Sequence, residues 1–138
     1  MDNKPRILLI EDEKGMVEAV RLRLEANGYE VMTSGDGEEG LIKARSEKPD
    51  LIILDVMLPT LDGLKVCRML KFDENYNDIP VVMFTAKTQE EDVACGKEVG
   101  ADAYVKKPFK SEELLKVIGD LLAKKNQPPS QNDTTASI

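Results

Sequence analysis

Histidine is absent from all 138 residues of the sequence, which removes the commonest general base of enzymes. Catalytic triads of the Ser/His/Asp or Cys/His type are therefore excluded. No apolar run approaches the roughly 20 residues needed to span a bilayer. The first residues, MDNKPR, lack the hydrophobic stretch of a signal peptide. These absences predict a cytoplasmic protein that does not enter a membrane.

Cysteine is scarce: Cys67 and Cys95 are the only two, and they are not at metal-ligand spacing. Both fall in segments with helical spacing, so we expect small core side chains rather than a disulfide or a metal site. Basic residues are outnumbered, with 19 Lys and Arg against 26 Asp and Glu and a net charge of -7. Because phosphate backbones are bound by patches of Lys and Arg, we expect no direct nucleic-acid binding by this domain.

Five short aliphatic runs recur along the chain, and each predicts a β-strand; the unbroken run at 51–54 is typical of a strand buried on both faces. They are RILLI (6–10), YEVMTS (29–34), LIIL (51–54), VVMF (81–84) and AYVK (103–106). Segments with the apolar spacing of helices follow each run. The predicted helices centre on residues 17–24, 41–44, 64–71, 88–98 and 114–122.

Strands that alternate with helices predict an α/β protein with a parallel sheet and helices on both faces. We expect a single doubly wound (βα)5 domain over residues 1–125, with strand order 2-1-3-4-5. Asp62-Gly63 is expected to open the third helix and Ser111 to cap the fifth. The polar tail at 126–138 is expected to be a disordered end or the start of a linker.

Polar residues stand where four of these strands end. They are Glu11-Asp12-Glu13, Asp55, Thr85-Ala86 and Lys106-Lys107-Pro108. In open parallel sheets ligands bind at the carboxyl ends of the strands, and the order 2-1-3-4-5 brings these four ends together. We therefore expect several acids, a hydroxyl and an ammonium group at one edge of the sheet.

Asp55 ends a strand that is otherwise entirely aliphatic, which gives its carboxylate a rigid mount close to Glu11 and Asp12. Like charges this close are costly unless a cation lies among them, and ligands that are all oxygen suit Mg²⁺. An Asp beside Mg²⁺, a Lys and a Thr hydroxyl is equipped to attack phosphorus. The product is an acyl phosphate. No histidine is needed in this chain, because the leaving group can arrive on another molecule.

Four stretches of the sequence resemble the receiver domains of bacterial response regulators, and the resemblance covers residues 5–124. They are LLIEDE (8–13), DLIILDVMLPTLDG (50–63), VVMFTAK (81–87) and GADAYVKKPF (100–109). A closing amphipathic helix completes the likeness. The resemblance implies a flavodoxin-like fold and a place in a two-component phosphorelay.

The resemblance also implies roles for individual residues. The phospho-acceptor is Asp55, the metal ligands are Glu11, Asp12, Asp55 and the backbone carbonyl of Met57, the switch residues are Thr85 and Tyr104, and the phosphate-binding lysine is Lys107. Lys107 is chosen over Lys106 because it directly precedes Pro108, and the bond between Lys107 and Pro108 is expected to be cis.

The function implied is a phospho-accepting signalling switch that catalyses only its own phosphorylation and dephosphorylation. The phosphoryl group is expected from a histidine kinase or a phosphotransfer protein. Movement of Thr85 and Tyr104 is then expected to alter the face formed by the helix at 88–98, the fifth strand and the fifth helix, which an output domain or protein reads. The chain is expected to be a monomer or a phosphorylation-dependent dimer.

Other functions stay open from the residues alone. A receiver-like interaction module that is never phosphorylated could carry the same acceptor residues. A Mg²⁺-dependent aspartyl-phosphate phosphatase needs a second Asp two residues after Asp55, where Met57 stands. A flavodoxin-like cofactor binder needs a phosphate-binding loop after the first strand, where the sequence is the acidic EDEKG.

For the phospho-accepting switch, the residue two positions after Asp55 affects how long the acyl phosphate lasts. Because the thioether of Met57 orients an attacking water poorly, we expect slow self-dephosphorylation.

Overall fold

The computed structural model describes residues 4–85, 100–107 and 110–125. In chain order the described elements are β1 (Arg6–Ile10), α1 (Lys14–Ala26), β2 (Glu30–Ser34), α2 (Gly37–Glu47), β3 (Leu51–Asp55), α3 (Gly63–Lys71), β4 (Val81–Thr85), β5 (Ala103–Lys106) and α5 (Ser111–Lys125). Each described strand begins and ends within one residue of the predicted run. The helix predicted at 88–98 and the tail at 126–138 lie outside the described residues.

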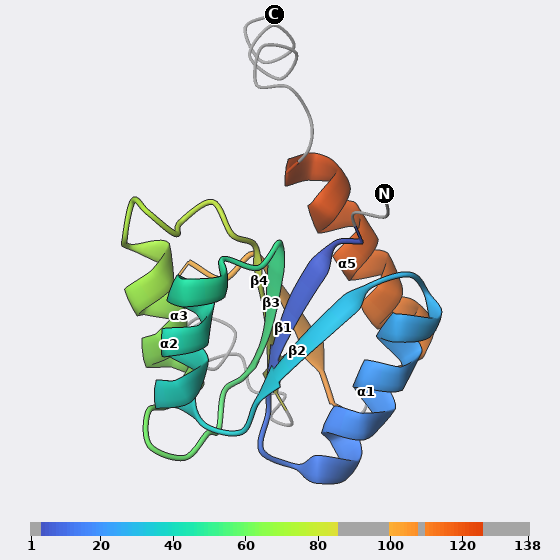
Figure 1. Cartoon of the computed structure of the whole chain (residues 1–138), viewed down its shortest axis with the longest axis horizontal. Coiled ribbons are helices and arrows are strands. Elements are labelled where there is room, and N and C mark those ends of the chain that lie inside the picture. Colours follow the sequence, from blue (N-terminus) through green and yellow to red (C-terminus); the bar gives the residue numbers. More distant parts are fainter. Residues whose placement is uncertain (1–3, 86–99, 108–109, 126–138) are drawn as a thin grey trace, which may run out of the picture.

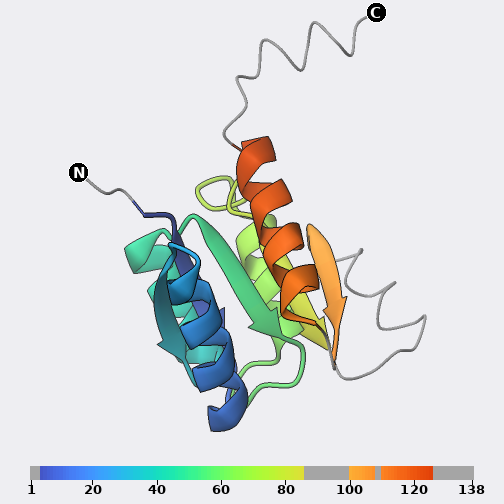
Figure 2. The same cartoon turned by 90° about the vertical axis from the view of Figure 1, so that its right-hand side faces the viewer.

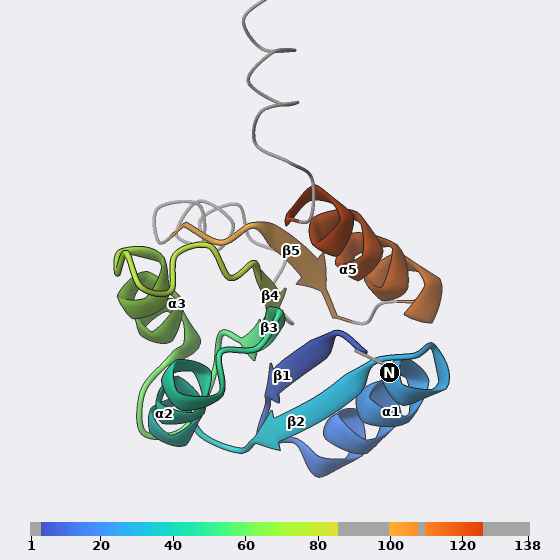
Figure 3. The same cartoon turned by 45° about the horizontal axis from the view of Figure 1, so that its top comes forward.

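The five strands form one parallel sheet in the order β2-β1-β3-β4-β5, which confirms the predicted topology. Figure 1 shows α2 and α3 on one side of the sheet and α1 and α5 on the other. The tilted view in Figure 3 shows the same two helical layers with the sheet between them. Crossovers between parallel strands are right-handed, and the step from β1 to β2 runs across the sheet in the opposite direction to the later steps, so α1 lies on one face and α2 and α3 on the other.

Two hydrophobic cores, one on each face of the sheet, hold these layers together. Along β1, Leu8 and Ile10 belong to the core under α2 and α3, whereas Ile7 and Leu9 belong to the core under α1 and α5. The alternation is that of any β-strand, and here both faces are buried. Figure 2 shows α1 and α5 in front of the sheet that they cover.

Cys67 lies in the core under α2 and α3, as the sequence predicted for a small hydrophobic side chain. Its burial raises the pKa of the thiol to about 12, so the thiol stays protonated at neutral pH. Cys95, for which the same role was predicted, lies outside the described residues.

Side-chain carboxylates cap the N-termini of the first three helices, each accepting backbone N–H groups of the first turn; they are Glu13, Asp36 and Asp62. The predicted opening of α3 at Asp62-Gly63 is therefore confirmed. The prediction that Ser111 caps α5 is wrong by one residue. The N–H of Leu114 bonds to the carbonyl oxygen of Lys110, so Ser111 is already the first helical residue. No helix in the described ranges has the length and apolar character to cross a membrane.

An ion pair that the sequence did not reveal joins α3 to the starts of β4 and β5. The ammonium of Lys71 donates to the carboxylate of Asp102 at 2.9 Å and to the carbonyl oxygens of Asn77 and Ile79 at 2.8 and 3.0 Å. The same carboxylate oxygen of Asp102 accepts the N–H of Val81 at 2.8 Å. The Lys71 side chain is only 11% exposed, so these contacts are partly shielded from water. They hold β5 in register beside β4.

We predict that Asp102→Ala lowers the free energy of unfolding by about 2 kcal/mol, because it leaves a shielded ammonium and the Val81 N–H without their acceptor. Urea denaturation measures the change. Asp120→Ala is the matched control, since it breaks an exposed ion pair with Lys116 on α5 and should cost about 0.5 kcal/mol or less. Equal losses in the two variants would contradict this role for Asp102.

Candidate functional site

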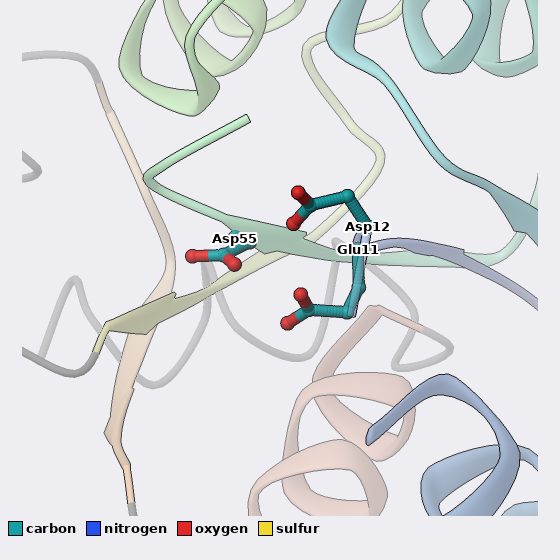
Figure 4. Close-up of side chains that lie close together, drawn as sticks. All are labelled: Glu11, Asp12 and Asp55. Atoms are coloured by element: carbon teal, nitrogen blue, oxygen red, sulfur yellow. The ribbon is translucent and has the colours of Figure 1, made fainter. Parts of the chain in front are cut away.

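Three carboxylates meet at the carboxyl edge of the sheet (Figure 4). Glu11 and Asp12 directly follow β1, and Asp55 is the last residue of β3. One carboxylate oxygen from each of the three lies within 4.8 Å of the other two. Glu11 and Asp55 are 2% and 6% exposed, whereas Asp12 is exposed. Negative charges this close repel one another strongly, and more so where burial removes water.

The fold brings these acids together because β1 and β3 are neighbours. Ile10 pairs with Leu54, so the residues that follow each of them leave the sheet side by side. Gly63 makes a close approach behind Asp55, since its N–H donates to the Val56 carbonyl oxygen at 2.9 Å. A Cβ atom at position 63 would lie 1.9 Å from the carbonyl oxygen of Asp55, so only glycine fits there.

Lys107, directly after β5, supplies the opposite charge. Its Nζ lies 2.8 Å from Oε1 of Glu11 and 3.2 Å from Oδ2 of Asp55. Partial burial alone would lower the pKa of Lys107, but the hydrogen bond to Glu11 and the charges of Asp55 and Glu11 outweigh it and raise that pKa. The stabilisation linked to this raised pKa is complete at neutral pH and is lost only as the pH rises past the ordinary lysine value of about 10.4.

Backbone N–H groups hold the remaining oxygens of the two buried acids. Oδ1 of Asp55 accepts the N–H of Met57 at 3.1 Å, and Oε2 of Glu11 accepts the N–H of Glu13 at 3.0 Å. The Glu13 side chain in turn caps α1, so this residue fixes both the helix start and the orientation of Glu11. In the sequence, Glu13 stood out only as part of the acidic run after the first strand. Its place just before a helical segment was the available signal for the cap.

An open cleft of about 940 Å³ lies in front of Asp55. Its polar lining comes from the three acids, Glu13, Asp62 and Lys107. Apolar residues of the segment after β3 form another part of its wall, namely Val56, Met57, Leu58, Pro59 and Leu64. In the sequence only Met57 of these stood out, because a short apolar run in a loop has the same pattern as core residues. A cleft of this volume has room for a group the size of a phosphate in front of Asp55.

The structure thus brings Glu11, Asp12, Asp55 and Lys107 together and places the exposed side chain of Met57 on the rim of the cleft. Lys106, in contrast, is an exposed strand residue. All three acids offer oxygen ligands, and the exposure of Asp12 leaves a side of the cluster accessible from solvent. This donor set fits a hard divalent cation.

The two predicted switch residues are less fully described. Thr85 ends β4 with Lys106 as its Cα partner, and its side chain lies outside the described part of the structure. Tyr104 is half-buried on β5 and packs against the core under α2 and α3. Pro108 is also outside the described residues, so the cis bond stays a prediction.

Comparison with known proteins identifies the family. Residues 7–119 match the response regulator receiver domain family, and the chain belongs to it. It is 49% identical over 109 residues to the alkaline phosphatase synthesis transcriptional regulatory protein PhoP of Bacillus subtilis (strain 168), covering 79% of this chain and 45% of PhoP. The resemblance to receiver domains that the sequence motifs carried is therefore confirmed.

Solved structures agree with this assignment. The chemotaxis response regulator CheY4 of Vibrio cholerae has a TM-score of 0.81 and 34% identity, over 86% of this chain and 99% of that chain. A second neighbour is the receiver domain of sensor histidine kinase PA1611 from Pseudomonas aeruginosa PAO1, solved with a magnesium ion coordinated in the active site cleft. It has a TM-score of 0.81 and 29% identity, over 87% of this chain and 98% of that chain. The chain spans about half the length of the curated relatives it matches.

We predict that Lys107→Met lowers the free energy of unfolding by about 2 kcal/mol in EDTA, because it leaves the buried carboxylates of Glu11 and Asp55 without their counter-charge. Lys106→Met is the matched control and should change stability by about 0.5 kcal/mol or less. Urea denaturation of both variants at neutral pH measures the two changes in the free energy of unfolding. A loss confined to Lys106→Met would show that the wrong lysine has been assigned.

Proposed function

We propose that this receiver domain is a phospho-accepting signalling switch in which Asp55 takes a phosphoryl group from a phosphohistidine. The observation that carries the proposal is the surroundings of Asp55: a buried carboxylate at a strand end, 3.2 Å from the ammonium of Lys107, facing an open cleft beside two further acids. A carboxylate needs such a setting to act as a nucleophile toward phosphorus, since positive charge must compensate the phosphoryl oxygens.

In the proposed reaction, a carboxylate oxygen of Asp55 forms a bond to phosphorus while the bond from phosphorus to the donor's leaving group breaks. The leaving group departs with that electron pair. The N–H of Met57 and the ammonium of Lys107 each hold one carboxylate oxygen, so Asp55 is oriented before the donor arrives. Lys107 can then pair with the incoming phosphoryl oxygens.

We propose Mg²⁺ as the cation of this site, held by Glu11, Asp12, Asp55 and the backbone carbonyl of Met57. When bound, it neutralises charge on the phosphoryl oxygens and on the acids. The oxygen ligands of the three acids support the choice of Mg²⁺, as does the magnesium ion in the cleft of the PA1611 receiver domain. Without a cation, the carboxylates of Glu11 and Asp12 would repel the anionic phosphoryl group and slow the attack.

The conformational response is proposed to start from the added charge. A phosphoryl group brings nearly two negative charges and three acceptors, which Thr85 and Lys107 would compensate. Movement of Thr85 toward Asp55 would open space for Tyr104 and change the surface of β5, α5 and the helix predicted at 88–98. A population shift of about 100-fold needs only about 3 kcal/mol of differential interaction, which a few charge-assisted hydrogen bonds supply.

The partners follow from this chemistry. The donor is proposed to be a histidine kinase or a phosphotransfer protein in the cytoplasm, and an output domain or protein would read the altered surface. The domain itself is not proposed to bind nucleic acid, because its net charge is -7. Its own phosphorylation and dephosphorylation are the only reactions that it would catalyse, as a monomer or a phosphorylation-dependent dimer.

We predict that incubation with phosphoramidate and Mg²⁺ adds the mass of one phosphoryl group to the chain, measured by intact mass spectrometry. Asp55→Asn should abolish the gain, and EDTA should suppress it. Asp120→Asn makes the same chemical change on the exposed surface of α5 and should leave the gain intact. No gain with any small phosphodonor would refute the proposal and favour an interaction module that works without phosphorylation.

The self-dephosphorylation rate tests the place of Met57 on the rim of the cleft. We predict that the acyl phosphate lasts minutes to hours, and that Met57→Asn shortens its lifetime by about tenfold, because an amide can orient the attacking water. Met69→Asn, at an exposed methionine of α3, is the control and should change nothing. Loss of the phosphoryl group from the wild-type chain within seconds would contradict the prediction.

A further inference from the structure

The ring of Phe84 lies beneath the ammonium of Lys107. Nζ of Lys107 is 5.5 Å from the centroid of this ring, within the range of a cation–π interaction. Phe84 is fully buried in β4, directly before Thr85. In the sequence, Phe84 is the last residue of the apolar run VVMF (81–84), and nothing there distinguishes it from an ordinary core residue.

The backbone of Phe84 is held from both neighbouring strands. It pairs with Asp55 of β3 and with Val105 of β5, and its carbonyl oxygen accepts the N–H of Val56 at 3.1 Å. Phe84 therefore lies beside Asp55 on one side. On the other side it lies beside Val105, two residues before Lys107. The complete burial of the Phe84 side chain restrains the ring at this place.

The ring adds attraction that the carboxylates cannot replace. Glu11 and Asp55 attract the ammonium by their charge and by directed hydrogen bonds, and the negative face of the aromatic ring adds an attraction that needs no directed hydrogen bond. An aliphatic side chain of similar volume would fill the same space without that attraction. The difference matters most when Lys107 has to exchange a carboxylate partner for phosphoryl oxygens.

We propose that Phe84 is a positioning residue for Lys107: its ring holds the ammonium at the cleft so that it meets the phosphoryl oxygens as they bind at Asp55. This inference rests on the proposed function, because the reaction in which Lys107 takes part is the phosphorylation of Asp55. It assigns a chemical role to a side chain that packs in the core under α1 and α5.

If Phe84 had only a structural role, changing the charge of its ring while keeping the ring shape would leave the rate of phosphorylation unchanged. Fluorinated phenylalanines at position 84, with one, two or three ring fluorines, retain the shape while withdrawing negative charge from the ring face. We expect the rate of phosphorylation by phosphoramidate to fall stepwise, by about three- to tenfold for the trifluoro ring, with little change in the urea midpoint. In a Lys107→Met background the same series should have no effect.

Phe72 provides the matched control. The Arg68 guanidinium lies 5.5 Å from its ring centroid, so the geometry is similar, but Phe72 is an exposed residue beyond the end of α3. Fluorination at position 72 should leave the phosphorylation rate unchanged. Rates that are flat across the Phe84 series, or that fall equally for Phe72, would overturn the proposal.

A second readout does not depend on phosphorylation. The ring should shift the ε-methylene protons of Lys107 upfield of those of Lys106 in NMR spectra, and Phe84→Leu should remove the difference while Phe72→Leu keeps it. Identical shifts for the two lysines would refute the positioning role. If the wild-type chain accepts no phosphoryl group, the proposed function fails, and this shift still decides whether Phe84 positions Lys107.

Discussion

The cost of placing three carboxylates at one edge of a sheet governs the chemistry of this domain. Glu11 and Asp55 are buried, and the ammonium of Lys107 lies between them at 2.8 and 3.2 Å. One positive charge cannot neutralise three acids, so a negative excess remains around Asp12. That negative excess favours binding of a divalent cation. When no cation is bound, it repels a phosphoryl group. In the proposed function, acceptance of phosphate would thereby be coupled to binding of a cation.

The rest of the fold supports that arrangement. Parallel order places β1 and β3 side by side, so Glu11 and Asp55 leave the sheet together, while β4 and β5 carry Phe84 and Lys107 to the same edge. Distant contacts maintain the register, notably the bonds of Lys71 to the segments before β4 and β5. The charged groups lie at the ends of these strands or directly after them, which is where ligands bind in open α/β sheets.

Much of this could be predicted from the sequence because it depends on short-range patterns. The aliphatic runs mark the strands, and the acids and lysines at their ends mark the edge where ligands bind. What could not be predicted depends on distances between remote residues. The bond of Lys107 to Glu11, the pairing of Lys71 with Asp102 and the ring of Phe84 under Lys107 leave no local signal. The one-residue error at Ser111 arose because a serine is favoured at the N-cap, whereas the first bond of α5 starts from the carbonyl oxygen of Lys110, a residue type without that preference.

A calorimetric titration of Mg²⁺ into the wild-type chain and into Asp12→Asn tests cation binding by the three acids most directly, with Asp120→Asn as the control for loss of a surface charge. Asp12 is exposed, so its replacement should not disturb the fold. We predict one bound ion per chain in the wild type and in the control, and affinity weaker by at least about tenfold in Asp12→Asn. No binding to the wild type, or equal affinity in all three proteins, would contradict the claim that these acids form a cation-dependent acceptor site.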